Sequence, residues 1–220
     1  MGFAELYDFL ERLQSNNNKA WMDENRKEYI KVRNWFVSWL DQMNDRLTAI
    51  DPDYYDTPGK KGINRINNNL MFHPERPVYK DHFSGGLDQL TKQGDFYVHF
   101  GISQSLIATG YYSPGSDVLK KIRAAIDYNG DELLAILNDK KFNELFDGLW
   151  DDGSKLTNAP KGYSSDHDYI ELLKFKHYAV EYSFERADVF KSGFEDHLVL
   201  LYEVSLPFRR YLRQAVSYEA

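Results

Sequence analysis

The sequence predicts an α+β fold in which a central antiparallel or mixed sheet is packed by long N- and C-terminal helices. Two observations predict it. Apolar residues recur at helical spacing near both ends of the 220-residue chain, whereas they alternate with polar residues in its middle. Strands gathered between helical ends are typical of α+β proteins and not of alternating βαβ units. The chain contains no internal repeat or linker, so we expect one globular domain over residues 1–220.

The N-terminal part is predicted to form a helical hairpin. Apolar residues make one stripe of a helix over residues 3–14, and the run Asn16-Asn17-Asn18 ends that helix and caps the next. The second helix is expected over residues 19–49, because Asp51-Pro52 stops it.

The middle of the chain is predicted to form strands. Residues 63–72 are expected to supply a short one, and the clearest alternation covers residues 96–102, which puts His99 opposite the apolar face. A second strand over residues 106–112 follows a turn, and a further one is expected over residues 174–184.

Helices are expected again in the C-terminal half. A helix begins at Ser116 and is broken at Gly130, and short helices follow around residues 133–137 and 142–149. The last helix is predicted from Ala187 onward, and Pro207 should kink or restart it.

The composition excludes several classes of function. The chain has no cysteine, so disulfides, thiolate metal sites and cysteine nucleophiles are absent. Its formal net charge of −7 works against non-specific binding to nucleic acid or anionic lipid, so we expect neither partner. No transmembrane run or signal peptide is visible, and we therefore expect a cytoplasmic protein. The oligomeric state stays open.

Motifs for metals and cofactors are missing as well. The six histidines do not occur at spacings that place two ligands on one metal, and the Gly59–Gly62 stretch lacks the ending of a phosphate loop. We therefore expect no metal site and no cofactor.

Charge is unevenly distributed along the chain. Residues 59–80 hold five Lys and Arg residues against Glu75 alone, whereas residues 131–152 hold seven acids against two lysines. One interpretation is two solvated faces of opposite sign. The other is that the basic segment lines an anion site. The planar guanidinium of Arg65 would then donate two hydrogen bonds to the anion, and the ammonium of Lys80 would supply a compact positive charge.

Several motifs together resemble a conserved hypothetical bacterial family, domain of unknown function 2461. In chain order they are Asn16-Asn17-Asn18 with Trp21, Asn25-Arg26 and Tyr29, Arg65-Ile66 to Phe72, Pro77-Val78-Tyr79-Lys80, Gly94 to His99, Ile122-Arg123, Ala159-Pro160-Lys161-Gly162-Tyr163 with Asp166-His167, Leu172 to Lys176, and Pro207-Phe208. The resemblance covers nearly the whole chain. It implies a cytoplasmic single domain and no particular activity.

The chain departs from this family at one motif. The family's typical pattern has arginines and an aspartate where this sequence has Asn68, Asn69 and Met71. If that cluster is catalytic in relatives, this chain has lost the reaction while keeping the shape, since neither amide nor thioether replaces the charges. If the cluster is a structural ion-pair network, the replacements are a permitted alternative, which is the interpretation that we favour.

Two hypotheses for function follow. The first is a pocket that binds or acts on a small anionic metabolite, and whether a reaction is catalysed stays open. Its candidate ligand-binding residues are Arg65, Asn69, Tyr79, Lys80, His99, Arg123, Lys161 and Lys174. The second is a non-enzymatic interaction module, which predicts an exposed patch of aromatic residues such as Trp21, Trp39 or Tyr111.

Overall fold

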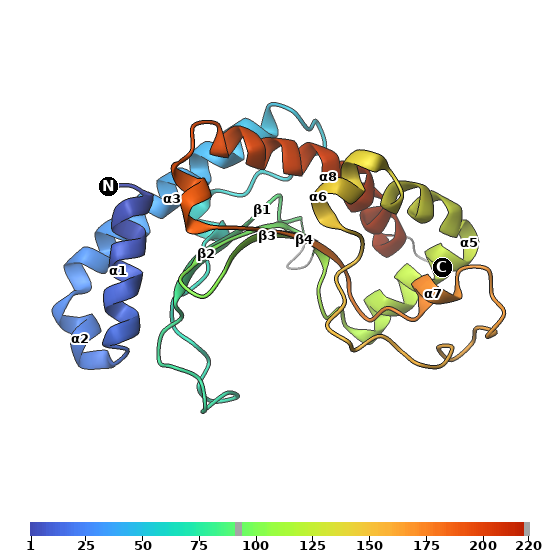
Figure 1. The fold of residues 1–220 in the computed structure, drawn as a ribbon, viewed down its shortest axis with the longest axis horizontal. Coiled ribbons are helices and arrows are strands. Elements are labelled where there is room, and N and C mark those ends of the chain that lie inside the picture. Colours follow the sequence, from blue (N-terminus) through green and yellow to red (C-terminus); the bar gives the residue numbers. More distant parts are fainter. Residues whose placement is uncertain (91–93, 218–220) are drawn as a thin grey trace. The chain divides into compact units, whose positions relative to one another are not determined.

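The structure is a computed structural model that describes residues 1–90 and 94–217 (Figure 1). Its elements are α1 (Phe3–Ser15), α2 (Lys19–Glu24), α3 (Arg26–Thr48), α4 (Gly59–Gly62), β1 (His82–Leu87), β2 (Phe96–Gly101), β3 (Ser105–Tyr111), α5 (Ser116–Leu137), α6 (Lys140–Phe146), α7 (Ile170–Leu173), β4 (Tyr178–Phe184), the 3₁₀-helix η1 (Arg186–Phe190) and α8 (Phe194–Ser217). The four strands form one antiparallel sheet in the order β1-β2-β3-β4, with helices before and after it in the chain. The predicted α+β class is confirmed.

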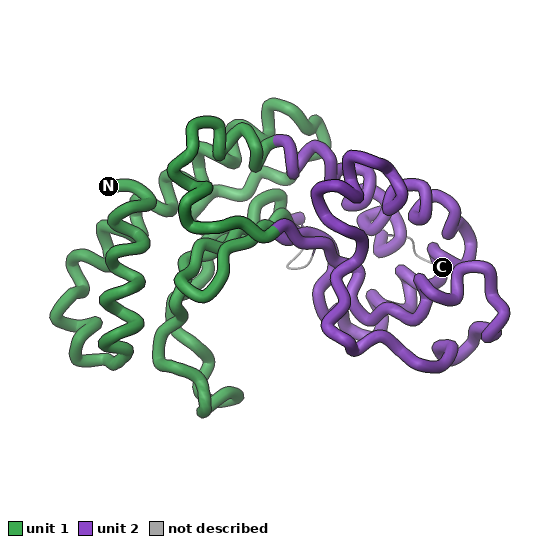
Figure 2. Tube along the Cα trace, in the orientation of Figure 1, with its two compact units in different colours: residues 1–89, 96–107, 183–199 green, residues 90–95, 108–182, 200–220 purple. Residues whose placement is uncertain are grey.

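The chain divides into two compact units, shown in Figure 2. Unit 1 comprises residues 1–89, 96–107 and 183–199, and unit 2 comprises residues 90–95, 108–182 and 200–220. Strands β3 and β4 and helix α8 each begin in one unit and end in the other. The single domain expected from the sequence stays a prediction, and each unit is described by itself.

The core of unit 1 lies between the helices and one face of β1 and β2. Phe83 on β1 is paired with Phe100 on β2 in the antiparallel register, so both side chains occupy that face. Phe36 of α3 packs 5.8 Å from Phe83 between ring centroids, and Trp39 meets Phe100 edge-on at 5.1 Å. Buried aromatic pairs of this kind hold the α1–α3 helices against the sheet.

The opposite face of the same two strands is polar. Side chains alternate along a strand, so His82 and Ser84 point away from the face that carries Phe83. Ser84 pairs with His99, which puts His99 and Tyr97 of β2 on this polar face too. The strand over residues 96–102 was predicted to within one residue, and His99 lies opposite the apolar face as predicted, although it is buried there.

The expected single helix over residues 19–49 is wrong, because the chain breaks at Asn25. Its backbone is not helical (φ −98°, ψ 13°), and its side-chain amide donates to the carbonyl oxygen of Trp21 at 2.8 Å. Such side-chain bonds to nearby backbone compete with the helix ladder. Asn18 does cap α2, since its side chain accepts from the backbone N–H of Trp21.

The expected strand over residues 63–72 is also wrong. That segment makes only isolated bridges, from Ile63 to Gly85 and from Asn67 to Tyr79. The strand of this region is β1, which the alternation pattern missed because Gly85 and Gly86 carry no side chain to show a face.

In unit 2 the positions of the elements differ from the expected ones by a few residues. Helix α5 runs to Leu137, with a non-helical backbone at Asn129 (φ −147°, ψ 56°) in place of the break predicted at Gly130. The helix around residues 142–149 already ends at Phe146, because Asp147 is left-handed (φ 50°). The last helix, α8, contains Pro207 and is not restarted there.

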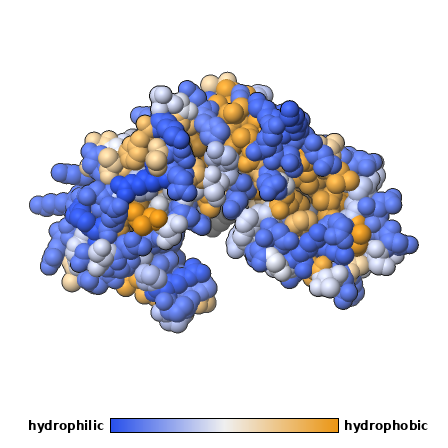
Figure 3. Space-filling view, viewed as in Figure 1, coloured by the Kyte–Doolittle hydropathy of each residue, from blue (hydrophilic) through white to orange (hydrophobic). Residues whose placement is uncertain are grey.

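None of the helices in the described part of the chain is long and apolar enough to cross a lipid bilayer. On the face seen in Figure 3, hydrophilic residues predominate and apolar residues occupy smaller areas between them. This distribution agrees with the 28% of charged residues in the sequence.

Candidate functional site

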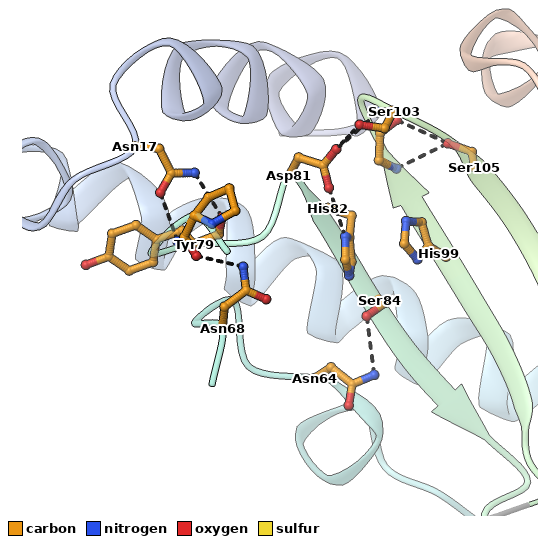
Figure 4. A network of polar contacts seen from close by, with 12 residues as sticks. Asn17, Asn64, Asn68, Tyr79, Asp81, His82, Ser84, His99, Ser103 and Ser105 are labelled. Atoms are coloured by element: carbon orange, nitrogen blue, oxygen red, sulfur yellow. Dashed lines mark hydrogen bonds and ion pairs between the residues drawn. The ribbon is translucent and has the colours of Figure 1, made fainter. Parts of the chain in front are cut away.

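The polar face of unit 1 holds a cluster of interacting side chains, which we call the histidine cluster: Asp81, His82, Tyr97, His99 and Ser103. Figure 4 shows Asp81, His82, His99 and Ser103 of this cluster. The rings of His82 and His99 stack with centroids 3.8 Å apart. They come from adjacent antiparallel strands, so the sheet itself fixes their distance. The cluster is therefore a rigidly held pair of imidazoles with a carboxylate at one end.

His99 is the buried member of this pair. Its exposed fraction is 8%, and its Nδ1 lies 3.1 Å from the hydroxyl of Tyr97. Burial, followed by the neighbouring charge of His82, lowers the pKa of His99 to about 3. Gly101 leaves room for the ring, because a Cβ there would lie 3.0 Å from His99 Nε2. His99 is consequently neutral at physiological pH.

Asp81 is held in its ionised form by donors on both oxygens. His82 Nδ1 lies 3.1 Å from one oxygen, and the backbone N–H of Ser103 donates to the other at 3.2 Å, as does the Ser103 hydroxyl. These hydrogen bonds, that of His82 foremost, hold the pKa of Asp81 well below its ordinary value although partial burial opposes them.

A group of three cations lies beside the histidine cluster: Arg65, Arg76 and Lys80, which we call the basic group. Lys80 is partly buried, and burial together with the charges of Arg65 and Arg76 lowers its pKa. The charge of Lys80 in turn contributes to lowering the pKa of His99, so the two groups share one electrostatic environment. Within residues 1–90 and 94–217, no carboxylate forms an ion pair with any of the three cations.

A short backbone ladder positions the basic group. Asn67 bridges Tyr79 antiparallel, and the backbone N–H of Lys80 donates to the carbonyl oxygen of Ile66 at 2.8 Å. Lys80 is thus opposite Ile66, the residue that follows Arg65, and Arg65 is opposite Asp81. The side chain of Asn17, between α1 and α2, donates to the Tyr79 carbonyl and accepts from its N–H, both at 2.9 Å. This amide ties the helical hairpin to the segment that carries Lys80.

One protein family matches nearly the whole chain. The family described as "Conserved hypothetical protein (DUF2461)" matches residues 5–211 of the 220. The chain belongs to this family. No curated protein and no solved structure matches the chain.

In this DUF2461 protein the three unusual positions lie in or near the turn of the ladder. Asn68 donates through its side chain to the carbonyl oxygen of Pro77 at 2.9 Å and so closes the turn. Asn69 is exposed, and its carbonyl accepts from His73. Met71 is 80% exposed. The side chains of Asn69 and Met71 thus lie at the surface, and their interpretation as a permitted structural change stays a prediction.

Five of the eight candidate residues belong to unit 1. Arg65, Lys80 and His99 lie in or beside the two groups described above, and Asn69 lies in the turn of the ladder. Tyr79 is only 4% exposed, and its backbone is already paired with Asn17 and Asn67. For this DUF2461 member, the side chain of Tyr79 is therefore a core residue.

The other three candidates belong to unit 2. Arg123 donates to the carbonyl oxygens of Leu173 and Phe175 at 2.9 and 3.1 Å, so its guanidinium holds a turn. Lys174 pairs with Glu171 at 2.8 Å, whereas Lys161 is exposed. A ligand-binding role for these three residues of the DUF2461 protein stays a prediction.

Sequence reasoning missed Asp81, His82 and Ser103, and it counted Arg76 in the basic segment 59–80 without making it a candidate ligand-binding residue. The available signal was the adjacency of Lys80, Asp81 and His82, which matters only once β1 is recognised as a strand. In the described part of this DUF2461 protein, no three His, Cys, Asp or Glu side chains come together as a group that could hold a metal ion.

Two of the three aromatic residues that the second hypothesis named as examples of an exposed patch are buried in this DUF2461 protein. Trp39 and Tyr111 are buried, because Trp39 packs on Phe36 and Phe100 and Tyr111 lies in β3. Trp21 is partly buried beside Phe9. Helical and strand periodicity had left open which of these rings faces the core.

Proposed function

We propose that unit 1 binds a small anionic metabolite, with the basic group as its electrostatic anchor and the histidine cluster beside it. The observation that carries this proposal is the partly buried Lys80 ammonium, whose pKa is lowered by burial and by the charges of two arginines and which forms no ion pair with a carboxylate of residues 1–90 and 94–217. Removing an ammonium from water next to two like charges is unfavourable unless an anion compensates it. A guanidinium pair and an ammonium are the donors that recognise carboxylates and phosphates.

The same observation predicts that the Lys80 charge lowers the free energy of unfolding of the unliganded protein. Burial and repulsion both disfavour the Lys80 charge, so the folded state without ligand is less stable than it would be with an apolar side chain there. A residue that is unfavourable for stability and favourable for binding is typical of a functional site. We place this binding function in the cytoplasm, as we expect from the sequence.

Thermal-shift measurements with a panel of anionic metabolites test the proposal. A ligand at about 100 times its Kd adds about 2.7 kcal/mol to the free energy of unfolding, which raises the Tm measurably. Lys80→Met should abolish the ligand-induced rise. Lys60→Met is the matched control, because Lys60 is an exposed lysine of α4 and its removal changes the net charge equally.

The stability of the same two variants gives an independent check. Lys80→Met should raise the Tm of the unliganded protein or leave it unchanged, since it removes an unfavourable charge and keeps the apolar stem. A large fall in Tm would show that Lys80 is a structural residue. Failure of every anion to shift the wild-type protein would contradict the proposal as a whole.

The alternative of an interaction module has less support. Two of the three aromatic residues on which it rested are buried. Met71 and Phe72 are exposed in the turn of the ladder, at 80% and 71%, but two adjacent side chains do not make an interface. We therefore favour anion binding.

A further inference from the structure

The hydrogen bond between Asp81 and His82 decides which ring nitrogen of His82 carries a hydrogen. Asp81 accepts from Ser103 and is ionised, and an ionised carboxylate has no hydrogen to donate. The contact of 3.1 Å with His82 Nδ1 is therefore an N–H···O bond in which Nδ1 is the donor. In the neutral ring, the lone pair is then on Nε2.

Two histidines of unit 2 have the opposite arrangement. His177 Nδ1 accepts from the backbone N–H of Ser113 at 2.9 Å, and His167 Nδ1 accepts from that of Tyr169 at 3.0 Å. Their Nε2 atoms carry the hydrogen and face Ser154 and Asp127, respectively. In both rings, each nitrogen already has a hydrogen-bond partner. His82 differs, because no group among the described residues bonds to its Nε2.

His82 Nε2 is consequently an acceptor, and the His82 ring stacks on His99, whose pKa the charge of Lys80 helps to lower. The ammonium of Lys80 and the guanidinium groups of Arg65 and Arg76 can only donate. An anion that satisfies these donors with its oxygens brings lone pairs toward Nε2 as well. The mismatch is removed only if the ligand also carries a hydrogen on oxygen that it can donate to Nε2.

We propose that this site selects a protic oxyanion, one that presents anionic oxygens to the basic group and an O–H group to His82 Nε2. Hydrogen phosphate is the simplest ligand of this class, and a hydroxylated carboxylate or phosphate ester has the same chemistry. Sulfate has the same shape and charge as hydrogen phosphate but no O–H at neutral pH. This inference rests on the proposed anion binding and goes beyond it by naming the selectivity.

Titration calorimetry with inorganic phosphate and with sulfate, at constant ionic strength, tests the selectivity. We choose about pH 8, where an imidazole is ordinarily neutral. Phosphate should bind at least about tenfold more tightly than sulfate, because a site built to accept a hydroxyl hydrogen rejects the analogue that lacks it. Equal affinities would overturn the selectivity and leave anion binding standing. Binding of neither ion would overturn the selectivity, and failure of the whole anion panel as well would overturn anion binding.

Asp81→Asn is the sharpest variant. The backbone N–H of Ser103 keeps an oxygen acceptor at its own side of the residue, so the new amide NH₂ faces His82 Nδ1 and must be accepted there. The hydrogen of His82 then moves to Nε2. The affinity for phosphate relative to sulfate should fall, or sulfate should become the tighter ligand. Asp127→Asn, beside His167 in unit 2, is the matched control and should keep the wild-type ratio.

Nitrogen-15 NMR of the wild-type histidines keeps the inference testable if Asp81→Asn does not fold. At about pH 8 the His82 ring should show a protonated Nδ1 and an unprotonated Nε2, with the reverse in His167 and His177. Added phosphate should shift the Nε2 resonance of His82, and sulfate should not. A His82 ring with the hydrogen on Nε2 would overturn the proposal.

Discussion

At the scale of single residues, the two stacked imidazoles show how the sheet controls protonation. His82 and His99 are 3.8 Å apart, yet one bonds a carboxylate and the other a phenol hydroxyl. Burial keeps His99 neutral, whereas Asp81 fixes the hydrogen of His82 on Nδ1. Two residues of one type thus have different chemical roles because their hydrogen-bond partners differ.

The pKa of His99 predicts an acid-sensitive fold. In the unfolded chain His99 takes up a proton below its ordinary pKa of 6.5, whereas the folded protein resists this until about pH 3. The unfolded state therefore binds more protons in this window, and stability falls as the pH drops through it, by at most about 1.4 kcal/mol per pH unit. Urea unfolding of wild type and His99→Gln at several pH values measures this loss.

His99→Gln should flatten the dependence on pH between about 6.5 and 5.5, above the range in which carboxylates such as Asp81 titrate in the unfolded chain. His73→Gln is the control for the removal of a histidine, because His73 is exposed and lies outside the histidine cluster. Parallel curves for wild type and His99→Gln would contradict the prediction.

Sequence alone could place His99, since alternation in β2 is unbroken from Phe96 to Phe100. It could not find His82, because Gly85 and Gly86 hide the alternation of β1. The protonation of either ring depends on partners far away in the sequence, such as Ser103 for Asp81. These contacts exist only after the strands pair.

At the scale of elements, glycine allows a close approach between β3 and β4 in unit 2. Gly110 has a left-handed backbone (φ 98°), and a Cβ there would lie 2.3 Å from the carbonyl oxygen of Tyr178 and 2.9 Å from the ring of Phe208. Any side chain at position 110 would push β3 away from β4 or displace the ring of Phe208 in α8.

Gly110→Ala should therefore destabilise the fold by more than about 3 kcal/mol, from backbone strain plus the steric clash. Gly153→Ala is the matched control, because Gly153 has a similar φ of 81° with nothing near its Cβ position. It should cost only about 1 kcal/mol, the strain alone. Chemical denaturation measures both values, and equal losses would show that strain, not the close approach, dominates.

The extents of the helices were less predictable than their existence. Asn25 interrupts a helical stripe that looks continuous in the sequence, since its side chain bonds to the backbone carbonyl of Trp21 without changing the apolar pattern. At the second interruption, one residue before the predicted break at Gly130, the Asn129 side chain donates to the carboxylate of Glu132. The candidate site was less predictable from the sequence than the fold. It lies on strand β1 and the ladder before it, where the periodic signal is weakest.

At the scale of the whole molecule, the chain order of the two units bears on cooperativity. Each unit is made of separate stretches of sequence, and β3, β4 and α8 pass from one unit into the other. Neither unit is a continuous segment that could be cut out of the chain. We therefore expect both to unfold in one transition, as the single domain predicted from the sequence requires.

Tryptophan fluorescence can test this expectation. Trp21, Trp35 and Trp39 lie in unit 1 and Trp150 in unit 2, so Trp150→Phe leaves reporters only in unit 1. Fluorescence and far-ultraviolet circular dichroism of this variant should give the same midpoint, since the helices of both units contribute to the dichroism. Two separate midpoints would show that the units unfold independently.

The bond pair between Asn17 and Tyr79 has a consequence for how the family can vary. The Asn17 side chain contacts only main-chain atoms of residue 79, so those bonds do not depend on which side chain stands there. Substitution should therefore be restricted at position 17, where an amide is needed to donate and accept at once. Among relatives, we expect position 17 to keep its asparagine even where the residue at 79 and the ligand have both diverged.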